Sequence, residues 1–123
     1  MDKSLSGRRI LVVEDEMIIL MLIEEVLTDC GCESVTAVAT VNRALALIDA
    51  QRFDVAMVDV NLNGHKSYAV ADALAARGVP FFFSTGYSED GLRDGYRNRP
   101  VLNKPFQREK LVEMLTSLLL LSE

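Results

Sequence analysis

Residues 55–60 read VAMVDV, a short run in which Asp59 is the one charged residue. Two comparable apolar runs occur at Ile10–Val13 and Phe81–Ser84. Continuously apolar runs of this length are typical of strands that are buried on both faces of a parallel sheet. We therefore predict a strand at each of the three runs. Two further runs complete the set, at Val35–Ala39 and Val101–Leu102.

Segments with helical spacing separate these runs. Apolar side chains recur three and four residues apart in four segments: Met17–Leu27, Val41–Ile48, Val70–Leu74 and about Gln107–Leu121. Thr40 has the residue type of a helix N-cap, and Gly31 and Gly78 stand where helices end. Strand and helix therefore alternate, which predicts an α/β fold with a doubly wound five-stranded parallel sheet covered by helices.

One crossover departs from this pattern. The sequence between Thr85 and Pro100 contains three glycines, many charged residues and few apolar positions. A glycine inside a helix costs about 1 kcal/mol relative to alanine. We therefore expect the helix between the fourth and fifth strands, within residues 86–100, to be short, frayed or missing.

Length and composition restrict the architecture and the class of partner. The chain has 123 residues, 50% of them hydrophobic, so we expect residues 1–123 to form a single domain with its own core. The net charge of −5 would repel a phosphate backbone, which argues against nucleic-acid binding. The longest apolar stretch, Met17–Ile23, is far too short to span a bilayer. Cys30 and Cys32 fit reduced thiols in a cytoplasmic protein.

Polar side chains stand at the carboxyl ends of the predicted strands, where open parallel sheets bind their ligands. Glu14 and Asp15 follow the first strand, Asp59 follows the third, Thr85 the fourth and Lys104 the fifth. Three converging carboxylates repel one another unless a cation neutralises them, and a small set of carboxylates with room for water suits Mg²⁺. An aspartate, a hydroxyl and a lysine beside such an ion are the groups needed to accept a phosphoryl group.

In these residues the chain resembles the receiver domains of two-component response regulators. The resemblance covers essentially the whole chain, with Glu14-Asp15, Asp59, Thr85 and Lys104-Pro105 in the family's order, each at a strand end. Residues 80–87, PFFFSTGY, are similar to the signature of the subgroup called FAT GUY regulators. The resemblance implies a flavodoxin-like receiver fold.

The resemblance also implies a role for each site residue. Asp59 would be the phosphoacceptor, taking a phosphoryl group from a sensor histidine kinase or a histidine phosphotransfer protein. Thr85 would hydrogen-bond the phosphoryl group, and Lys104 would pair with the carboxylate or phosphoryl oxygens. Mg²⁺ would be held by Glu14, Asp15, Asp59 and the backbone carbonyl of Asn61.

The response to phosphorylation is expected to differ from the family pattern. Three positions before the lysine, where receivers usually carry a switching aromatic residue, this chain has Val101. Tyr87 is the nearest aromatic residue to the site along the chain, so Thr85 and Tyr87 are our switch candidates. We expect phosphorylation to order or move the segment Tyr87–Arg99.

Two other classes of protein use related parts. A small Mg²⁺-dependent phosphohydrolase of the haloacid dehalogenase type also has an aspartate nucleophile, but that family places it after the first strand with a second acid two positions on. Here Asp59 follows the third strand and position 61 is asparagine. A flavodoxin-like FMN carrier needs a phosphate-binding loop after the first strand, where this chain has the acidic run Glu14–Glu16.

The favoured hypothesis is a single-domain response regulator that is not a dedicated enzyme and has no output domain of its own. Its output would pass through contacts with a downstream protein target. Met17–Ile23 is apolar nearly all round, and this pattern fits either a buried helix or a docking face. The run Leu118–Leu121 favours packing at the end of a helix over a dimer seam.

Overall fold

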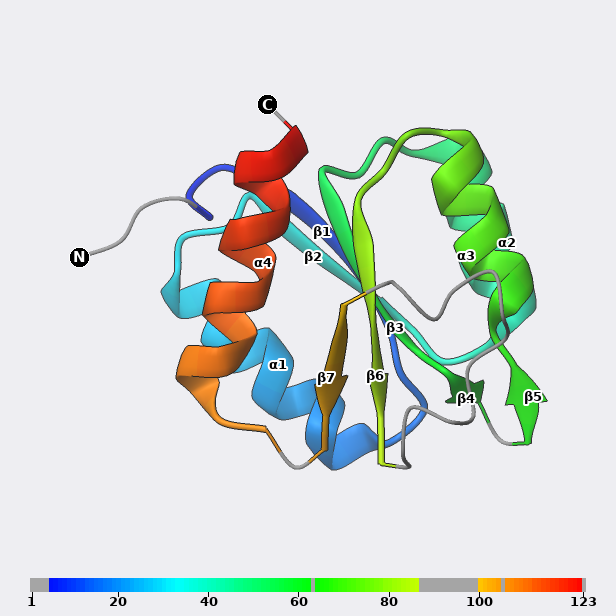
Figure 1. Ribbon diagram of the computed structural model, residues 1–123, viewed down its shortest axis with the longest axis horizontal. Helices are drawn as coiled ribbons and strands as arrows, with labels where there is room; N and C mark the ends of the chain where they lie inside the picture. Colours follow the sequence, from blue (N-terminus) through cyan, green and yellow to red (C-terminus); the bar gives the residue numbers. More distant parts are fainter. Residues whose placement is uncertain (1–4, 63, 87–99, 105, 123) are drawn as a thin grey trace.

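The computed structural model describes residues 5–62, 64–86, 100–104 and 106–122. Its core is one parallel sheet with the strand order β2-β1-β3-β6-β7 (Figure 1). The strands are β1 (Arg9–Val13), β2 (Ser34–Val38), β3 (Val55–Asp59), β6 (Phe81–Thr85) and β7 (Val101–Asn103). Each predicted strand is present, and its ends lie within one residue of the expected ones. The predicted five-stranded parallel sheet is confirmed.

Helices cover both faces of the sheet in the described part of the chain. They are α1 (Met17–Asp29), α2 (Val41–Ala50), α3 (Tyr68–Ala76) and α4 (Arg108–Ser122). Figure 1 shows α1 and α4 on one side of the sheet and α2 and α3 on the other. The sheet is therefore doubly wound, with helices on both faces, as predicted.

Alternation along the strands divides the core into two layers. Phe81 and Phe83 pack with the residues under α2 and α3, whereas Phe82 packs on the opposite face with Leu111 and Leu115 of α4. All three phenylalanines have no exposed surface. Side chains of adjacent strand residues point to opposite faces, so a strand covered by helices on both sides must be apolar at every position.

Local signals set the helix ends. The side chain of Thr40 accepts a hydrogen bond from the backbone amide of Arg43 at 3.2 Å, which confirms it as the N-cap of α2. Gly31 and Gly78, which follow α1 and α3, have φ angles of 79° and 70°. A side chain at either position would be strained, because this left-handed region favours glycine.

A small antiparallel hairpin follows β3, and the sequence interpretation missed it. It pairs β4 (Asn61–Leu62) with β5 (His65–Lys66). The dipeptide Asn63-Gly64 was the available signal, since Asn-Gly between two short strands is a common hairpin turn. Gly64 has a φ of 87°, as such a turn requires.

Two predictions fall on residues that the structure does not describe. The crossover expected to lack a full helix, residues 86–100, is described only at Gly86 and Pro100. Tyr87, the aromatic switch candidate, also lies outside the described residues.

The apolar residues of α1 and α4 divide between core and surface. In α1, Ile23 is buried, whereas Met17, Ile18, Met21 and Leu22 are 46% to 83% exposed. In α4, Leu118 and Leu119 are buried, so the end of this helix packs on the sheet as expected. Among the described residues, no helix combines the length and apolar character needed to cross a membrane.

Both cysteines are reduced and of intermediate burial. Burial, and secondarily the neighbouring Cys30, raises the pKa of Cys32 to about 11. A thiol with a raised pKa carries little thiolate at neutral pH and is a poor nucleophile. The structure therefore gives Cys32 the character of an inert core thiol.

Candidate functional site

The sheet topology brings the acidic residues together. The chain leaves β1 toward β2 on one side and returns to β3 on the other, so β1 and β3 flank the point where strand order reverses. Glu14 directly follows β1 and Asp59 ends β3, with 1% and 4% of their surfaces exposed. Carboxylate oxygens of Glu14, Asp15, Glu16 and Asp59 lie within 4.8 Å of one another.

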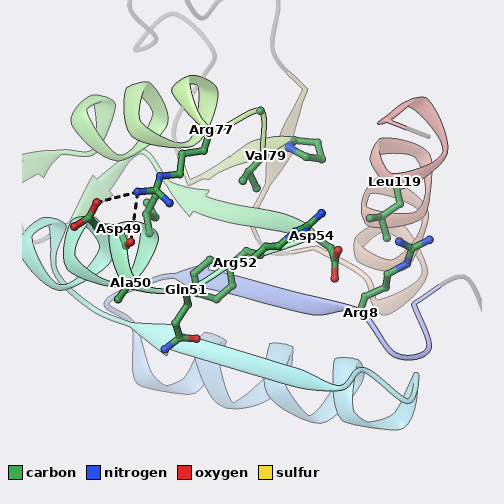
Figure 2. A pocket seen from close by; sticks show the side chains of 13 residues that line it. Arg8, Asp49, Ala50, Gln51, Arg52, Asp54, Arg77, Val79 and Leu119 are labelled. Atoms are coloured by element: carbon green, nitrogen blue, oxygen red, sulfur yellow. Dashed lines mark hydrogen bonds and ion pairs between the residues drawn. The ribbon is translucent and has the colours of Figure 1, made fainter.

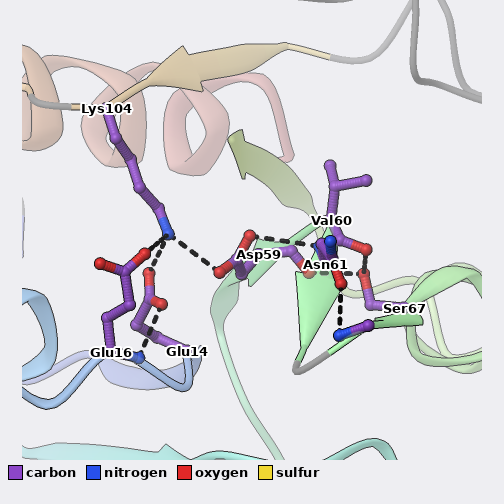
Figure 3. A network of polar contacts seen from close by, with 8 residues as sticks. Glu14, Glu16, Asp59, Val60, Asn61, Ser67 and Lys104 are labelled. Atoms are coloured by element: carbon purple, nitrogen blue, oxygen red, sulfur yellow. Dashed lines mark hydrogen bonds and ion pairs between the residues drawn. The ribbon is translucent and has the colours of Figure 1, made fainter. Parts of the chain in front are cut away.

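Lys104 supplies the positive charge of this acidic cluster. It follows the edge strand β7, and its side chain reaches past β6 to the acids at the ends of β1 and β3 (Figure 3). The Nζ atom lies 2.7 Å from Glu14 Oε1, 2.9 Å from Asp59 Oδ2 and 3.4 Å from Glu16 Oε1. Only 9% of the lysine side chain is exposed. Its ammonium group is therefore a buried counter-ion shared by three carboxylates.

The pKa values of Glu14 and Lys104 are both raised, for different reasons. Burial raises the pKa of Glu14 to about 7, against the lowering effect of Lys104 and of the Glu16 amide. Burial alone would lower the pKa of Lys104, but its interactions with Glu14 and Asp59 outweigh burial and raise that pKa above its ordinary value. The ammonium group is therefore charged at neutral pH, whereas the Glu14 carboxyl exchanges between its protonated and ionised forms near pH 7.

Three oxygens of Asp59 are each held by a different partner. Oδ1 accepts a hydrogen bond from the Asn61 amide at 3.2 Å, and Oδ2 accepts one from Lys104 at 2.9 Å. The backbone oxygen accepts one from the Ser67 hydroxyl at 2.6 Å. Asn61 is itself held in the hairpin, because its side-chain oxygen accepts a hydrogen bond from the Gly64 amide at 2.8 Å. Asp59 is thus held at both carboxylate oxygens and at its backbone oxygen.

Thr85 lies at the same edge of the sheet. It is the last residue of β6 and is 5% exposed, and its neighbour Ser84 pairs in register with Asp59. Its backbone oxygen accepts a hydrogen bond from the amide of Lys104 at 2.9 Å. The threonine and the lysine are therefore joined through their backbones, and both reach the strand-end region that holds the acids.

The donor set fits a hard divalent cation. Carboxylate oxygens are preferred ligands of Mg²⁺, which is usually held by one or two carboxylates and retains several waters. Glu14 has a pKa near 7, so it can give up its proton to a metal ion at neutral pH. The acidic cluster thus has both the chemistry and the protonation behaviour of a magnesium pocket.

A separate pocket lies at the other edge of the sheet. It has a volume of about 680 Å³ and is lined by residues that precede strands, including Arg8, Asp54 and Pro80 (Figure 2). Arg77, which caps α3, pairs there with Asp49 in the last turn of α2 at 2.8 Å. Cations are favoured where helices end, so this pairing has a structural explanation. The acidic cluster remains the candidate site.

A family model described as "Response regulator receiver domain" matches residues 10–116. The chain belongs to this family. The strand order, the strand-end acids and the buried lysine of this receiver domain agree with the resemblance noted in its sequence. As a receiver domain it acts in phosphorylation-activated two-component signalling, and the phosphohydrolase alternative is not favoured. Receiver domains bind Mg²⁺ at an acidic pocket, and this chain has such a pocket.

Solved structures of receiver proteins superpose closely on this receiver domain. The solution structure of SdrG from Sphingomonas melonis Fr1 is 44% identical, with a TM-score of 0.81, and the match covers 97% of this chain and 99% of SdrG. The receiver domain of the sensor histidine kinase PA1611 from Pseudomonas aeruginosa PAO1 is 28% identical, with a TM-score of 0.75 and coverage of 93% and 98%. The PA1611 crystal structure holds a magnesium ion coordinated in its active-site cleft.

A curated relative is longer than this receiver domain. The transcriptional regulatory protein TcrA of Mycobacterium tuberculosis is 33% identical over 123 residues, which cover 92% of this chain and 46% of TcrA. The chain therefore spans about half the length of that relative, and the match concerns the shared receiver region.

The sequence interpretation missed two residues of the site. Glu16 follows the predicted metal ligands in the chain, and its carboxylate turns back to within 3.4 Å of Lys104. Its place in the acidic run Glu14–Glu16 was the available signal. Ser67 binds the backbone of Asp59, and it carried no signal beyond its place just before a helix.

Proposed function

We propose that Asp59 accepts a phosphoryl group from a phosphohistidine on a sensor histidine kinase or a histidine phosphotransfer protein. The observation that carries this proposal is the buried Asp59 carboxylate, with Oδ2 2.9 Å from Lys104, inside a cluster of acids at the strand ends. A carboxylate oxygen attacks phosphorus, the bond between phosphorus and the imidazole nitrogen breaks, and the leaving imidazole takes a proton from solvent. The products are an aspartyl phosphate and a neutral histidine.

Mg²⁺ is the proposed cofactor of this reaction. Glu14, Asp15, Asp59 and the backbone carbonyl of Asn61 would hold it, leaving positions open for water and phosphoryl oxygens. When bound, the ion supplies positive charge to the oxygens of the transferring group. The hydrogen bond from the Asn61 amide to Asp59 Oδ1 supports this set, because it keeps the hairpin backbone next to the acceptor.

Lys104 and Thr85 have complementary proposed roles. Lys104 would pair with the phosphoryl oxygens, and its position 2.9 Å from Asp59 Oδ2 supports that role. Thr85 would donate its hydroxyl to the phosphoryl group and so report its presence, with Tyr87 as the second switch residue. Val101 at the usual aromatic position supports a switch based on the segment after Thr85.

The proposed organisation is one receiver domain over residues 1–123. It would self-catalyse phosphoryl acceptance and slow dephosphorylation only, and its output would be contact with a downstream protein target. The reduced state of Cys30 and Cys32 supports a cytoplasmic location. The sequence PFFFSTGY at residues 80–87 supports membership of the FAT GUY subgroup.

The exposed apolar face of α1 is the proposed contact surface for the phosphodonor protein. Met17, Ile18, Met21 and Leu22 form this face, and α1 begins directly after Glu16, whose carboxylate lies in the acidic cluster. A donor histidine must come within bonding distance of Asp59, so its protein must cover the surface beside the cluster. Contiguous exposed apolar side chains favour such a contact.

Labelling with acetyl phosphate and Mg²⁺ tests the acceptor. The wild-type chain should gain one phosphoryl group by intact mass spectrometry, and chelation of the metal should abolish the gain. Asp59→Asn should not be labelled, whereas Asp49→Asn, which changes an exposed acid at the far edge of the sheet, should be labelled normally. An adduct that persists in Asp59→Asn would refute the assignment, and steady turnover of many phosphate esters would support a hydrolase.

A further inference from the structure

Ser67 occupies an N-cap position but does not cap its helix. It precedes α3, and its side chain makes no capping hydrogen bond to that helix. Thr40, which precedes α2, accepts a hydrogen bond from the amide of Arg43 in the ordinary way. An N-cap hydroxyl normally satisfies one of the free amides of the first turn. The Ser67 hydroxyl is therefore used elsewhere, at the expense of its own helix.

The hydroxyl is directed at the backbone of the phosphoacceptor. Ser67 Oγ donates to the backbone oxygen of Asp59 at 2.6 Å and lies 3.3 Å from that of Val60 (Figure 3). The side chain of Ser67 has no exposed surface, so water cannot replace this bond. A buried carbonyl that loses a hydrogen-bond donor carries a cost of desolvation that water cannot offset there.

The backbone of Ser67 completes a link between β3 and α3. Its amide donates to the Val60 oxygen at 3.0 Å, and its own oxygen accepts from the amides of Val70 and Ala71 at 3.0 and 3.2 Å. Every polar group of Ser67 is thus engaged, on one side with the end of the acceptor strand and on the other with the first turn of α3.

We propose that Ser67 is a positioning residue for phosphorylation, because its hydroxyl holds the Asp59 carbonyl and thereby aims the Asp59 carboxylate at the incoming phosphorus. This inference rests on the proposed function. The held carbonyl belongs to the peptide that links Asp59 to Val60. The orientation of this peptide fixes the direction of the Asp59 side chain and the position of the Asn61 amide, which lies 3.2 Å from Asp59 Oδ1. Attack requires the reacting atoms near contact distance and aligned, so a small rotation of this peptide misdirects the nucleophile.

The test compares hydroxyl removal at Ser67 with hydroxyl removal at a matched buried serine. Ser84 pairs in register with Asp59, is 1% exposed, and its Oγ has no hydrogen-bond partner, so Ser84→Ala removes the same atom without removing a bond. Each variant is phosphorylated with acetyl phosphate and Mg²⁺ over a range of donor concentrations.

Ser67→Ala should lower the rate at saturating donor about tenfold and change the half-saturating donor concentration less than about twofold. Ser84→Ala should stay within about twofold of wild type, and Ser67→Thr, which keeps the hydroxyl, should recover about half of the wild-type rate. If Ser67→Ala does not fold, Ser67→Cys keeps the volume with a weak donor and should show the same selective loss of rate.

Three outcomes would overturn the inference. They are a wild-type rate in Ser67→Ala, an equal loss in Ser84→Ala, and a loss confined to the half-saturating concentration. None of these outcomes would contradict the proposed function, because the wild-type chain would still form its adduct on Asp59. Absence of any adduct on the wild-type chain would instead refute the proposed function.

Discussion

Replacement of Glu14 by glutamine should stabilise the Mg²⁺-free protein at alkaline pH while impairing its metal site. Glu14 is 1% exposed, and burial is the largest influence on its carboxyl group, raising the pKa from 4.5 to about 7. The folded protein therefore pays to ionise this side chain, and glutamine does not ionise. The nearby ion pair with Lys104 reduces this cost without removing it.

The sign and size of the effect follow from proton linkage. Between the unfolded pKa of 4.5 and the folded pKa of about 7, the folded chain binds the proton that the unfolded chain has lost. Stability contributed by this group therefore falls as pH rises through that window. A rise in pKa of this size corresponds to about 3 kcal/mol, reached in full at pH values above the folded pKa.

Urea unfolding without Mg²⁺, at about pH 5 and about pH 8, measures this difference. Glu14→Gln and wild type should be nearly equally stable at the lower pH, and the variant should be more stable by about 3 kcal/mol at the higher pH. Glu25→Gln is the matched control, since Glu25 lies exposed on α1, and its profile should follow wild type. Saturating Mg²⁺ should stabilise wild type by about 2.7 kcal/mol at one hundred times its Kd and stabilise Glu14→Gln less.

Parallel pH profiles for wild type and Glu14→Gln would refute this reasoning, because the difference must grow with pH if the buried carboxyl titrates near 7. A variant that is less stable than wild type at about pH 8 would also contradict it. That result would mean that the ion pair with Lys104 outweighs the cost of burial.

Three further perturbations probe the acidic cluster and the α1 face. Lys104→Met should destabilise the Mg²⁺-free protein by about 3 kcal/mol near pH 8, because two buried carboxylates lose their cation, and unchanged urea unfolding would contradict this. Glu16→Gln removes a 60% exposed charge, so labelling by anionic acetyl phosphate should quicken by no more than about fivefold, with the gain vanishing in high salt. Ile18→Glu should slow phosphotransfer from the cognate kinase about tenfold and leave acetyl phosphate labelling unchanged. An equal slowing by Leu120→Glu, an exposed position on α4, would count against the α1 face.

The strands and the edge at which they end were predictable, because a strand that is buried on both faces must be apolar at nearly every position. A run such as Phe81–Phe83 can be apolar throughout only if helices cover both sides, and the parallel connections then carry every strand end to one edge. Glu14, Asp59 and Lys104 come from three strands far apart in the sequence, and this rule alone was enough to place them together. This rule depends only on the alternation of strands and helices, and not on side-chain conformation.

The two site residues that the sequence interpretation missed depend on side-chain directions that strand patterns do not encode. Glu16 precedes a helix, and it belongs to the cluster only because its carboxylate turns back toward Lys104. Ser67 has the residue type of an N-cap, so local preference predicts a bond to its own helix, whereas the structure directs its hydroxyl to Asp59. Both residues stand at N-cap positions, but neither side chain caps its helix. Each makes a tertiary contact instead, with Lys104 or with Asp59, and the sequence indicates only the N-cap position.

The charges of the acidic cluster imply an order of events in phosphorylation. When Glu14, Asp15, Glu16 and Asp59 are all ionised, Lys104 leaves an excess of three negative charges among these five groups. Such an excess attracts a divalent cation and repels a phosphoryl group, which is itself anionic. Productive encounter with a phosphodonor therefore follows occupation by Mg²⁺. Because Glu14 holds a proton below pH 7, acid lowers both the negative charge and the number of metal ligands, so phosphorylation should require more Mg²⁺ as pH falls.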